Sequence, residues 1–224
     1  MIPERTLQYI YELQFASKLL NINLLEGKGK RALDVGCGKG YGLLALKALG
    51  YDVYGYDINT DNVKFCKMLG FKNVCTFNLE NGIPFKEDFH LITCFDVLEH
   101  VKSLEKALKN LLLANYKYLI ITVPNLHTEF IRLMYLTIQK KTLPSFIKGR
   151  GFLLRDPDHV NMYGPYMWYC KVGRTLTYLN VKCSIKVSNY FMISLTPTLG
   201  KCIILRVPYI GSSTMIAVVR ESCV

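Results

Sequence analysis

The segment LDVGCGKGYG (residues 33–42) combines an acid at Asp34 with glycines at alternate positions just after it. Glycine tolerates positive φ and lets a ligand approach the main chain closely. The spacing, GxGxG over Gly36, Gly38 and Gly40, differs from the GxGxxG that dinucleotide sites require. A loop of this kind predicts a ligand site if it follows a strand, and otherwise only a structural turn.

A second acid, Asp57, ends the apolar segment DVYGYD (residues 52–57). A carboxylate at a strand end can accept hydrogen bonds from both hydroxyls of a ribose. In an open parallel sheet, ligands bind at the carboxyl ends of the strands, where the strand order reverses. Together the loop and Asp57 therefore predict a nucleoside site, and the alternative is a structural glycine turn with a capping aspartate.

The surrounding chain alternates between short apolar runs and amphipathic segments of about ten residues, which is typical of βαβ units and a parallel sheet. The apolar runs are nearly continuous, as expected for strands covered on both faces. Predicted strands cover residues 31–36, 52–57, 73–78, 89–96, 116–125, 181–194 and 214–221. Predicted helices cover residues 4–20, 41–50, 59–70, 103–113, 127–140 and 166–179.

Residues 126–165 interrupt this alternation with a long, basic segment. Such interruptions are uncommon in compact domains and indicate a lid or a binding insert. His159, which follows Asp156 and Asp158 in this segment, is a candidate lining of the acceptor pocket. The aromatic cluster MYGPYMWY (residues 162–169) could also line that pocket, and the favoured alternative is that it forms core of the helix at 166–179.

The chain has 224 residues, half of them hydrophobic, which suits one domain with a sizeable core. Its net charge of +11 is uneven: residues 127–224 carry 13 basic and 4 acidic side chains, a net +9. A basic half favours an anionic partner, which could be nucleic acid, an anionic small-molecule acceptor or an acidic membrane surface. A solvated lysine-rich surface is the alternative.

No signal peptide is apparent, and no apolar run reaches the ~20 residues of a membrane span. We therefore expect a soluble, cytoplasmic protein. The eight cysteines form no CxxC pair, and this spacing argues against a zinc ribbon or a thioredoxin-like motif. Most are expected to be buried thiols, and a disulfide is the alternative. The sequence contains no signal for an oligomeric state.

Five segments, LDVGCGKGYG, VYGYDIN, NLENGIPF, CFDVLEHV and ITVPN, resemble in order and spacing the class I S-adenosylmethionine-dependent methyltransferases, and most of all the branch of quinone-biosynthesis O-methyltransferases. The resemblance covers residues 31–125. It implies an α/β, Rossmann-like sheet of seven mostly parallel strands, with helices on both faces, an antiparallel last strand and an insertion after the fifth strand. Residues 1–224 would form a single domain, with a helical lead-in at 1–30 and residues 126–165 covering the acceptor site.

The resemblance also implies S-adenosylmethionine as cofactor, S-adenosylhomocysteine as product, and a role for each matching residue. The loop after the first strand would hold the methionine part, and Asp57 the ribose. Asn78 stands where the family usually has aspartate, but an amide oxygen can still accept from the adenine amine. The full set of expected cofactor residues is Asp34, Gly36, Cys37, Gly38, Gly40, Asp57, Ile58, Asn78, Leu79 and Phe95.

Methyl transfer from a sulfonium is an in-line displacement, and the enzyme's main task is to align the reacting atoms. A general base is needed only when the acceptor arrives protonated. His100 and His159 are the candidates, because an unperturbed histidine titrates near neutral pH. The alternatives are a structural role for His100 and an exposed loop position for His159. Glu99 beside His100 could contact a divalent metal, but two adjacent residues are no metal signature, and no metal site is predicted.

The favoured interpretation is a methyltransferase acting on an O or N of a small or lipid-like molecule. An RNA methyltransferase is the second hypothesis, supported by the basic half but not by any [DN]PP[FY] tetrad, because the fourth strand ends in FDVL. A catalytically silent, cofactor-binding partner subunit is the third.

Overall fold

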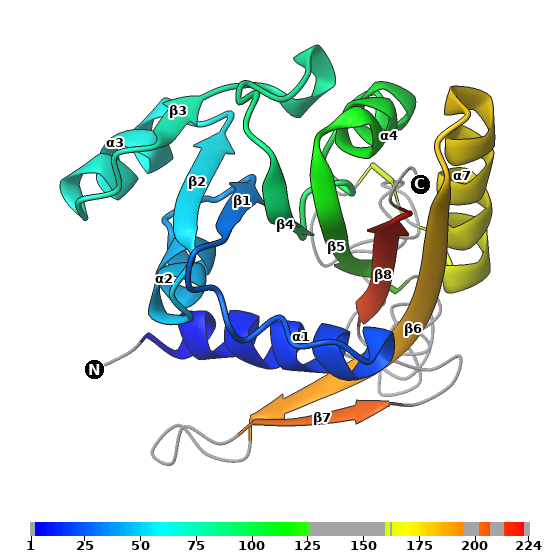
Figure 1. The fold of residues 1–224 in the computed structure, drawn as a ribbon, viewed down its shortest axis with the longest axis horizontal. Helices are drawn as coiled ribbons and strands as arrows, with labels where there is room; N and C mark the ends of the chain where they lie inside the picture. The colour runs from blue at the N-terminus through cyan, green and yellow to red at the C-terminus, as the bar shows by residue number, and fades with distance from the viewer. Residues whose placement is uncertain (1–2, 126–159, 162, 195–201, 207–212, 222–224) are drawn as a thin grey trace, which may run out of the picture.

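The computed structural model describes residues 3–125, 160–161, 163–194, 202–206 and 213–221 (Figure 1). One mixed sheet runs through this part of the chain in the order β3-β2-β1-β4-β5-β8-β6-β7. Its strands are β1 (Arg31–Val35), β2 (Asp52–Asp57), β3 (Val74–Thr76), β4 (Phe89–Phe95), β5 (Tyr116–Pro124), β6 (Cys183–Ser194), β7 (Cys202–Arg206) and β8 (Ser213–Arg220).

The first five strands are parallel to one another, and β8 runs antiparallel between β5 and β6. All seven predicted strands are therefore present, and the antiparallel last strand is confirmed. An eighth strand, β7, pairs antiparallel with β6 at the edge of the sheet. The sequence analysis did not include it, because prolines and glycines on both sides of residues 202–206 gave that stretch the pattern of a loop.

The helices lie on both faces of the sheet (Figure 1). On one face, α1 and α2 pack against Ala32, Leu91 and Ile120 of the sheet. On the other face, α4 and α7 bury Ile92, Leu119 and Trp168. The helices are α1 (Glu4–Leu20), α2 (Tyr41–Ala48), α3 (Thr60–Met68), the short 3₁₀ helix η1 (Leu79–Asn81), α4 (Leu104–Leu113) and α7 (Pro165–Leu179).

These bounds confirm five of the predicted helices to within a few residues. The predicted helix 127–140 and most of the predicted insert 126–165 lie outside the described residues. Six cysteines whose side chains the structure describes are free thiols: Cys37, Cys66, Cys75, Cys94, Cys170 and Cys183. Within the described ranges, no helix has both the length and the apolar character needed to cross a membrane.

The strand order reverses between β1 and β4, since the chain proceeds from β1 through β2 to β3 and then returns to β4 and β5 on the other side. In open α/β sheets the loops on either side of such a reversal diverge, and ligands bind between them at the carboxyl edge. Residues 36–40 and 96–103 form the loops that follow β1 and β4, so the fold brings the glycine loop and the FDVLEHV segment to the same edge.

Candidate active site at the carboxyl edge of the sheet

The glycine loop turns sharply between β1 and α2. Gly36, Gly38 and Gly40 all have positive φ, at 68°, 50° and 81°, which other residues adopt at a cost. A Cβ on Gly36 would also lie 2.4 Å from Cγ2 of Val97, whereas nothing lies within 4 Å of the corresponding position on Gly38. The loop is therefore packed against the β4 loop at one end and open at its centre, where a ligand can reach the main chain.

Asp57 holds the open centre of this loop. Its Oδ2 accepts from the Gly38 N–H at 2.8 Å, and its Oδ1 accepts from the Asn59 N–H at 2.8 Å and from Asn62 Nδ2 at 3.3 Å. A carboxylate offers about four acceptor positions, so Asp57 keeps capacity for a ligand hydroxyl. The strand-end acid thus also organises the glycine loop, a role that the sequence analysis did not assign to it.

Asp34 is buried under the same loop, with 2% of its surface exposed. Its Oδ1 accepts from Thr93 Oγ1 at 2.8 Å, while Oδ2 has no hydrogen-bond partner within the described structure. Burial raises the pKa of Asp34 to about 7, and the hydrogen bond from Thr93 opposes this shift. A cationic group beside Oδ2 would satisfy the unpaired oxygen and offset the cost of burying its charge.

Gly42 belongs to this arrangement, although the sequence analysis counted it only as one more glycine. A Cβ at position 42 would lie 2.3 Å from Asp34 Oδ2, so any side chain there would displace the carboxylate. Helix α2 can pass this close to Asp34 only because residue 42 has no side chain. Its position in the first turn of the predicted helix, directly after Tyr41, was the feature of the sequence that could have indicated a close approach.

Cys37 lies in the loop but faces the interior. Its N–H donates to the Tyr56 carbonyl at 3.0 Å, and its own carbonyl accepts from Gly40 N–H at 2.8 Å. The thiol is 3% exposed and packs with Cys66, Leu43 and other apolar side chains. The thiol of Cys37 therefore helps to shape the loop, and a cofactor contact by Cys37 stays a prediction.

Of the three residues expected to contact the adenine, Ile58 is exposed, Asn78 is half-buried and Leu79 is buried. Ile58 is 68% exposed directly after Asp57, as an apolar cover for a flat ring would be. Asn78 Oδ1 accepts from the Glu80 N–H at 2.9 Å and so caps η1. Leu79 is buried with α4, and its carbonyl accepts from Asn110 Nδ2 at 2.8 Å. Direct adenine contacts by Asn78 and Leu79 stay predictions.

Residues from α1 complete the site on the other side of β4, and the sequence analysis missed them. Phe95 is buried, and its ring stacks on that of Tyr9 with centroids 5.2 Å apart. Burial raises the pKa of Tyr9, and the nearby charges of Asp34, Glu12 and Asp96 raise it further. Helix α1 therefore places a phenol and a carboxyl group close to the carboxyl end of β4.

Glu12 is buried on α1, where its Oε1 accepts from the Tyr190 hydroxyl at 3.1 Å. Burial raises the pKa of Glu12, and the charge of Asp96 adds to this effect. Asp96 itself follows β4 with φ of 55°, a conformation that is uncommon for residues other than glycine and typical of functional sites. Glu12 and Asp96 therefore place two carboxyl groups near the carboxyl end of β4.

His100 lies on the β4 loop with an exposed side chain, and its N–H donates to the Val97 carbonyl at 3.0 Å. The structure thus brings it to the same edge as Asp34 and Asp57. His159 lies outside the described residues, as does His127. Among the residues that the structure does describe, no group of three His, Cys, Asp or Glu side chains could hold a metal ion.

Asn161 fixes the β4 loop from outside. Its Nδ2 donates to the carbonyls of Leu98 at 3.0 Å and Val101 at 2.6 Å. The N–H groups of Val160 and Asn161 donate to the Glu99 carbonyl at 2.8 and 3.1 Å. Four hydrogen bonds therefore attach the chain that precedes α7 to the loop that carries His100. No sequence signal pointed to Asn161, because its partners lie about sixty positions away.

Comparisons with known proteins relate the chain to one family. Residues 7–174, more than half of the chain, match the model of a family described as a methyltransferase domain. A stretch of 81 residues is 35% identical to a ubiquinone biosynthesis O-methyltransferase from Burkholderia multivorans. That stretch covers 34% of this chain and 35% of the relative, so the chain matches about a third of the relative's length.

Two solved structures show the same fold. One is a methyltransferase from Thermotoga maritima, described as dependent on S-adenosylmethionine and as a possible histamine N-methyltransferase. It gives a TM-score of 0.63 at 18% identity, over 95% of this chain and 89% of that one. The other is magnesium protoporphyrin IX methyltransferase from Synechocystis PCC 6803 with bound S-adenosylhomocysteine. It gives a TM-score of 0.54 at 20% identity, over 96% and 84% of the two chains.

Proposed function

The chain belongs to the methyltransferase domain family, whose cofactor is S-adenosylmethionine, and we propose that it transfers a methyl group from this cofactor to an O or N of a small or lipid-like acceptor. One observation carries the proposal: a glycine loop, open at Gly38, lies between the two buried carboxylates Asp34 and Asp57. A nucleoside with a cationic tail matches this arrangement of acceptors and open main chain.

The residues fit the cofactor in three places. The unpaired Oδ2 of Asp34 would accept from the ammonium group of the methionine part. Asp57, which already organises the loop, would accept from the ribose hydroxyls. The exposed Ile58 would cover the adenine. Cys37 and Asn78 would support these contacts by holding the loop and η1 in shape.

The bound cofactor supplies a methyl group already activated on a sulfonium. The protein's part is to hold the acceptor in line with that methyl group and to exclude competing orientations. Phe95 would lie close to the methionine part, and Tyr9, which stacks on Phe95, would with Asp96 contact or orient the acceptor. His100, and His159 outside the described residues, would take a proton from a protonated acceptor.

Two observations bear on the class of acceptor. The curated relatives act in ubiquinone biosynthesis by their printed name, and a phenolic hydroxyl is consistent with a base near neutral pH. The net charge of +9 on residues 127–224 supports an anionic acceptor. Such an acceptor would be RNA, as in the second hypothesis, or an anionic small molecule. A cytoplasmic location stays a prediction from the sequence.

A transfer assay with cofactor labelled in its methyl group tests the proposal. The full chain is incubated with a panel of catechols and hydroxybenzoates, and separately with bulk tRNA. We expect label in the phenol fraction, and a large loss of transfer in Asp57→Ala. Label in tRNA alone would replace the favoured acceptor by the RNA hypothesis. No transfer to either, with cofactor binding intact, would support the silent partner subunit.

A further inference from the structure

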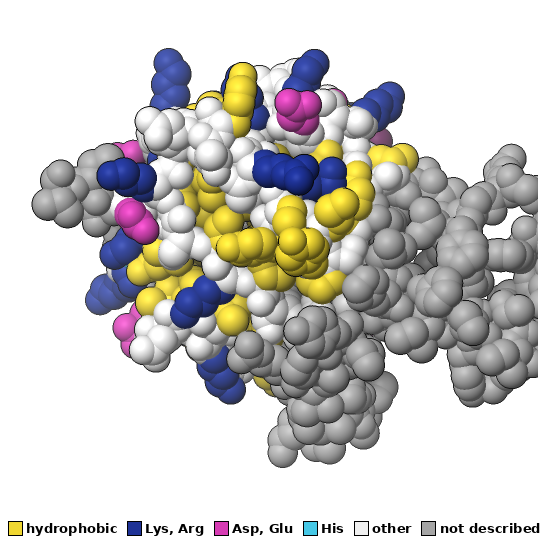
Figure 2. Space-filling model, turned by 90° about the vertical axis from the view of Figure 1, so that its right-hand side faces the viewer, with side chains coloured by type: hydrophobic (Ala, Val, Ile, Leu, Met, Phe, Trp, Pro, Cys, Tyr) yellow, Lys and Arg dark blue, Asp and Glu magenta, His cyan; other side chains and the backbone are white. Residues whose placement is uncertain are grey.

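The outward side of α7 exposes an unusual set of large side chains. Tyr166 is 77% exposed, Met167 51%, Tyr169 48% and Tyr178 81%, and Arg174 is also exposed. We call these five residues the α7 outer face. Figure 2 shows hydrophobic side chains gathered on this side of the molecule, with Lys and Arg side chains among and around them. Contiguous apolar patches of this kind mark binding surfaces.

The packing of α7 does not require these residues. Its inward positions Trp168, Val172 and Leu176 recur every four residues and are almost completely buried. They fix the helix against the core that it shares with α4. The tyrosines and Met167 therefore lie on the remaining side, where charged residues are the usual choice for a solvated helix.

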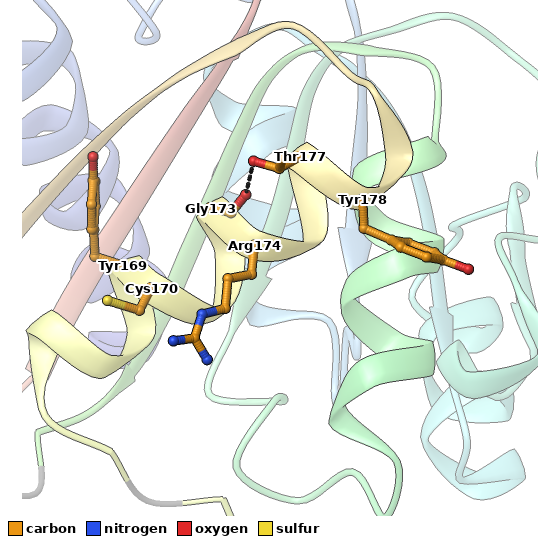
Figure 3. Close-up of a pocket in the computed structure, with 6 residues that line it drawn as sticks. All are labelled: Tyr169, Cys170, Gly173, Arg174, Thr177 and Tyr178. Carbon is orange, nitrogen blue, oxygen red and sulfur yellow. Dashed lines mark hydrogen bonds between the residues drawn. The ribbon is translucent and has the colours of Figure 1, made fainter.

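A shallow depression of about 510 Å³ crosses this helix, lined by Tyr169, Cys170, Gly173, Arg174, Thr177 and Tyr178 (Figure 3). Gly173 contributes no side chain to it, and the Thr177 hydroxyl donates back to the Gly173 carbonyl at 3.0 Å. Beyond the guanidinium of Arg174, the depression offers mostly ring faces and aliphatic surface. This composition suits contact with a broad surface better than capture of one small polar molecule.

The charge on α7 has one sign. The helix contains Lys171 and Arg174 and no acidic residue, and Lys182 follows it closely. Lys171 Nζ lies 4.3 Å from the centroid of the Tyr163 ring, which keeps this cation beside the aromatic residues. Cations next to tyrosines on one helix face match an interface with anionic headgroups above and hydrocarbon below.

We propose that the α7 outer face docks the protein on an anionic lipid bilayer. Tyr166, Met167 and Tyr178 enter the boundary between headgroups and acyl chains, and Arg174 and Lys171 pair with lipid phosphates. Self-association through this face would bring like charges together, and the open depression lacks the groove that single-stranded RNA needs. The inference stands independently of methyl transfer, because it rests on a surface that the candidate active site does not use.

Vesicle co-sedimentation of the full chain tests the proposal. The probes are vesicles of phosphatidylcholine alone and vesicles in which about a quarter of the lipid is phosphatidylglycerol. We expect binding to the anionic vesicles to be roughly ten-fold stronger and to fall steeply as salt rises from about 0.05 to 0.5 M. Equal binding to both vesicle types, or none to either, would overturn the proposal.

Paired variants locate the contact. Met167→Ser with Arg174→Glu should weaken binding to anionic vesicles by at least about ten-fold. The control is Met68→Ser with Lys67→Glu on α3, where Met68 is 84% exposed, and it should bind like the wild type. Equal losses in both variants would refute a site on α7.

Further measurements check that the variants are folded and test a second copy of the chain and RNA as alternative partners of the α7 outer face. Trp168 is the only tryptophan and is fully buried, so its unchanged emission verifies that α7 stays packed in each variant. Size-exclusion chromatography and poly(U) binding are run on the same proteins. A dimer, or poly(U) binding, that the α7 variant abolishes while vesicle binding persists would assign the face to that partner and contradict the proposal.

Discussion

Asp34 should give the protein a measurable pH signature. Its folded-state pKa of about 7 lies above the ordinary value of 3.8, so between these values the folded state binds more protons than the unfolded state. The contribution of Asp34 is therefore complete below the lower value and is lost as pH rises through 7. Asp34→Asn removes this dependence.

Urea unfolding of the wild type and Asp34→Asn at pH 5 and pH 8 measures this effect. We expect the free energy of unfolding of the wild type to drop more between these values, by an additional amount on the order of 2–3 kcal/mol. Glu12 also titrates abnormally, but it is present in both proteins and cancels in the comparison. Parallel pH profiles would show that Asp34 titrates as an ordinary acid.

Gly42→Ala tests the close passage of α2 over Asp34. The new Cβ would lie 2.3 Å from Oδ2, so we expect a loss of about 1–3 kcal/mol in stability from overpacking and weaker cofactor binding. Gly173→Ala is the matched control, because its nearest contact is Ile185 Cδ1 at 3.9 Å. There a helical alanine should stabilise the protein by about 0.5–1 kcal/mol. Similar effects at both positions would argue against the close contact.

At the scale of elements, Asn161 should control the β4 loop. Asn161→Ala removes both side-chain hydrogen bonds to the carbonyls of Leu98 and Val101. We expect amides 98–103 to exchange with deuterium roughly ten-fold faster, as loss of these bonds permits local opening. Asn110→Ala, which frees the Leu79 carbonyl instead, should accelerate exchange around η1 and at Lys102, whose N–H donates to Glu80 Oε1 on η1, and should leave amides 98–101 unchanged. The reverse pattern would contradict the assignment.

Local patterns were sufficient to predict most elements. Helix α1 was predicted at 4–20 from its apolar spacing and has these bounds in the structure. The strand ends carrying Asp34 and Asp57 were predicted to meet, and a hydrogen bond from the Gly38 N–H to Asp57 connects them. The edge strand β7 escaped detection because its pairing with β6 depends on tertiary context rather than on local composition.

The site residues that sequence reasoning missed are those that depend on contacts across the chain. Glu12 meets Tyr190 only after α1 has packed on the sheet, and Asn161 reaches the β4 loop only when α7 is in place. The thiol of Cys37 packs beside Cys66, which the position of Cys37 in the loop did not indicate, and its contact with the cofactor stays a prediction. A motif identifies where the main chain bends and leaves side-chain direction undetermined.

At the scale of the whole molecule, acidic site residues and the basic excess come from different halves of the chain. The acidic groups at the carboxyl edge, Asp34, Asp57 and Asp96, come from the first half of the chain, which is nearly neutral overall. The basic excess belongs to residues 127–224, which include α7. A cationic nucleoside and an anionic surface would therefore bind to separate parts of one domain.

Titration calorimetry with S-adenosylhomocysteine tests the central claim most directly, because the product binds without turnover. The account predicts one equivalent bound by the wild type, binding weakened by roughly 100-fold in Asp57→Ala through loss of charge-assisted hydrogen bonds, and unchanged binding in Asp52→Ala, at the exposed start of the same strand. A folded wild-type protein that produces no binding heat at millimolar ligand, or an Asp57→Ala variant that binds as tightly as the wild type, would contradict it.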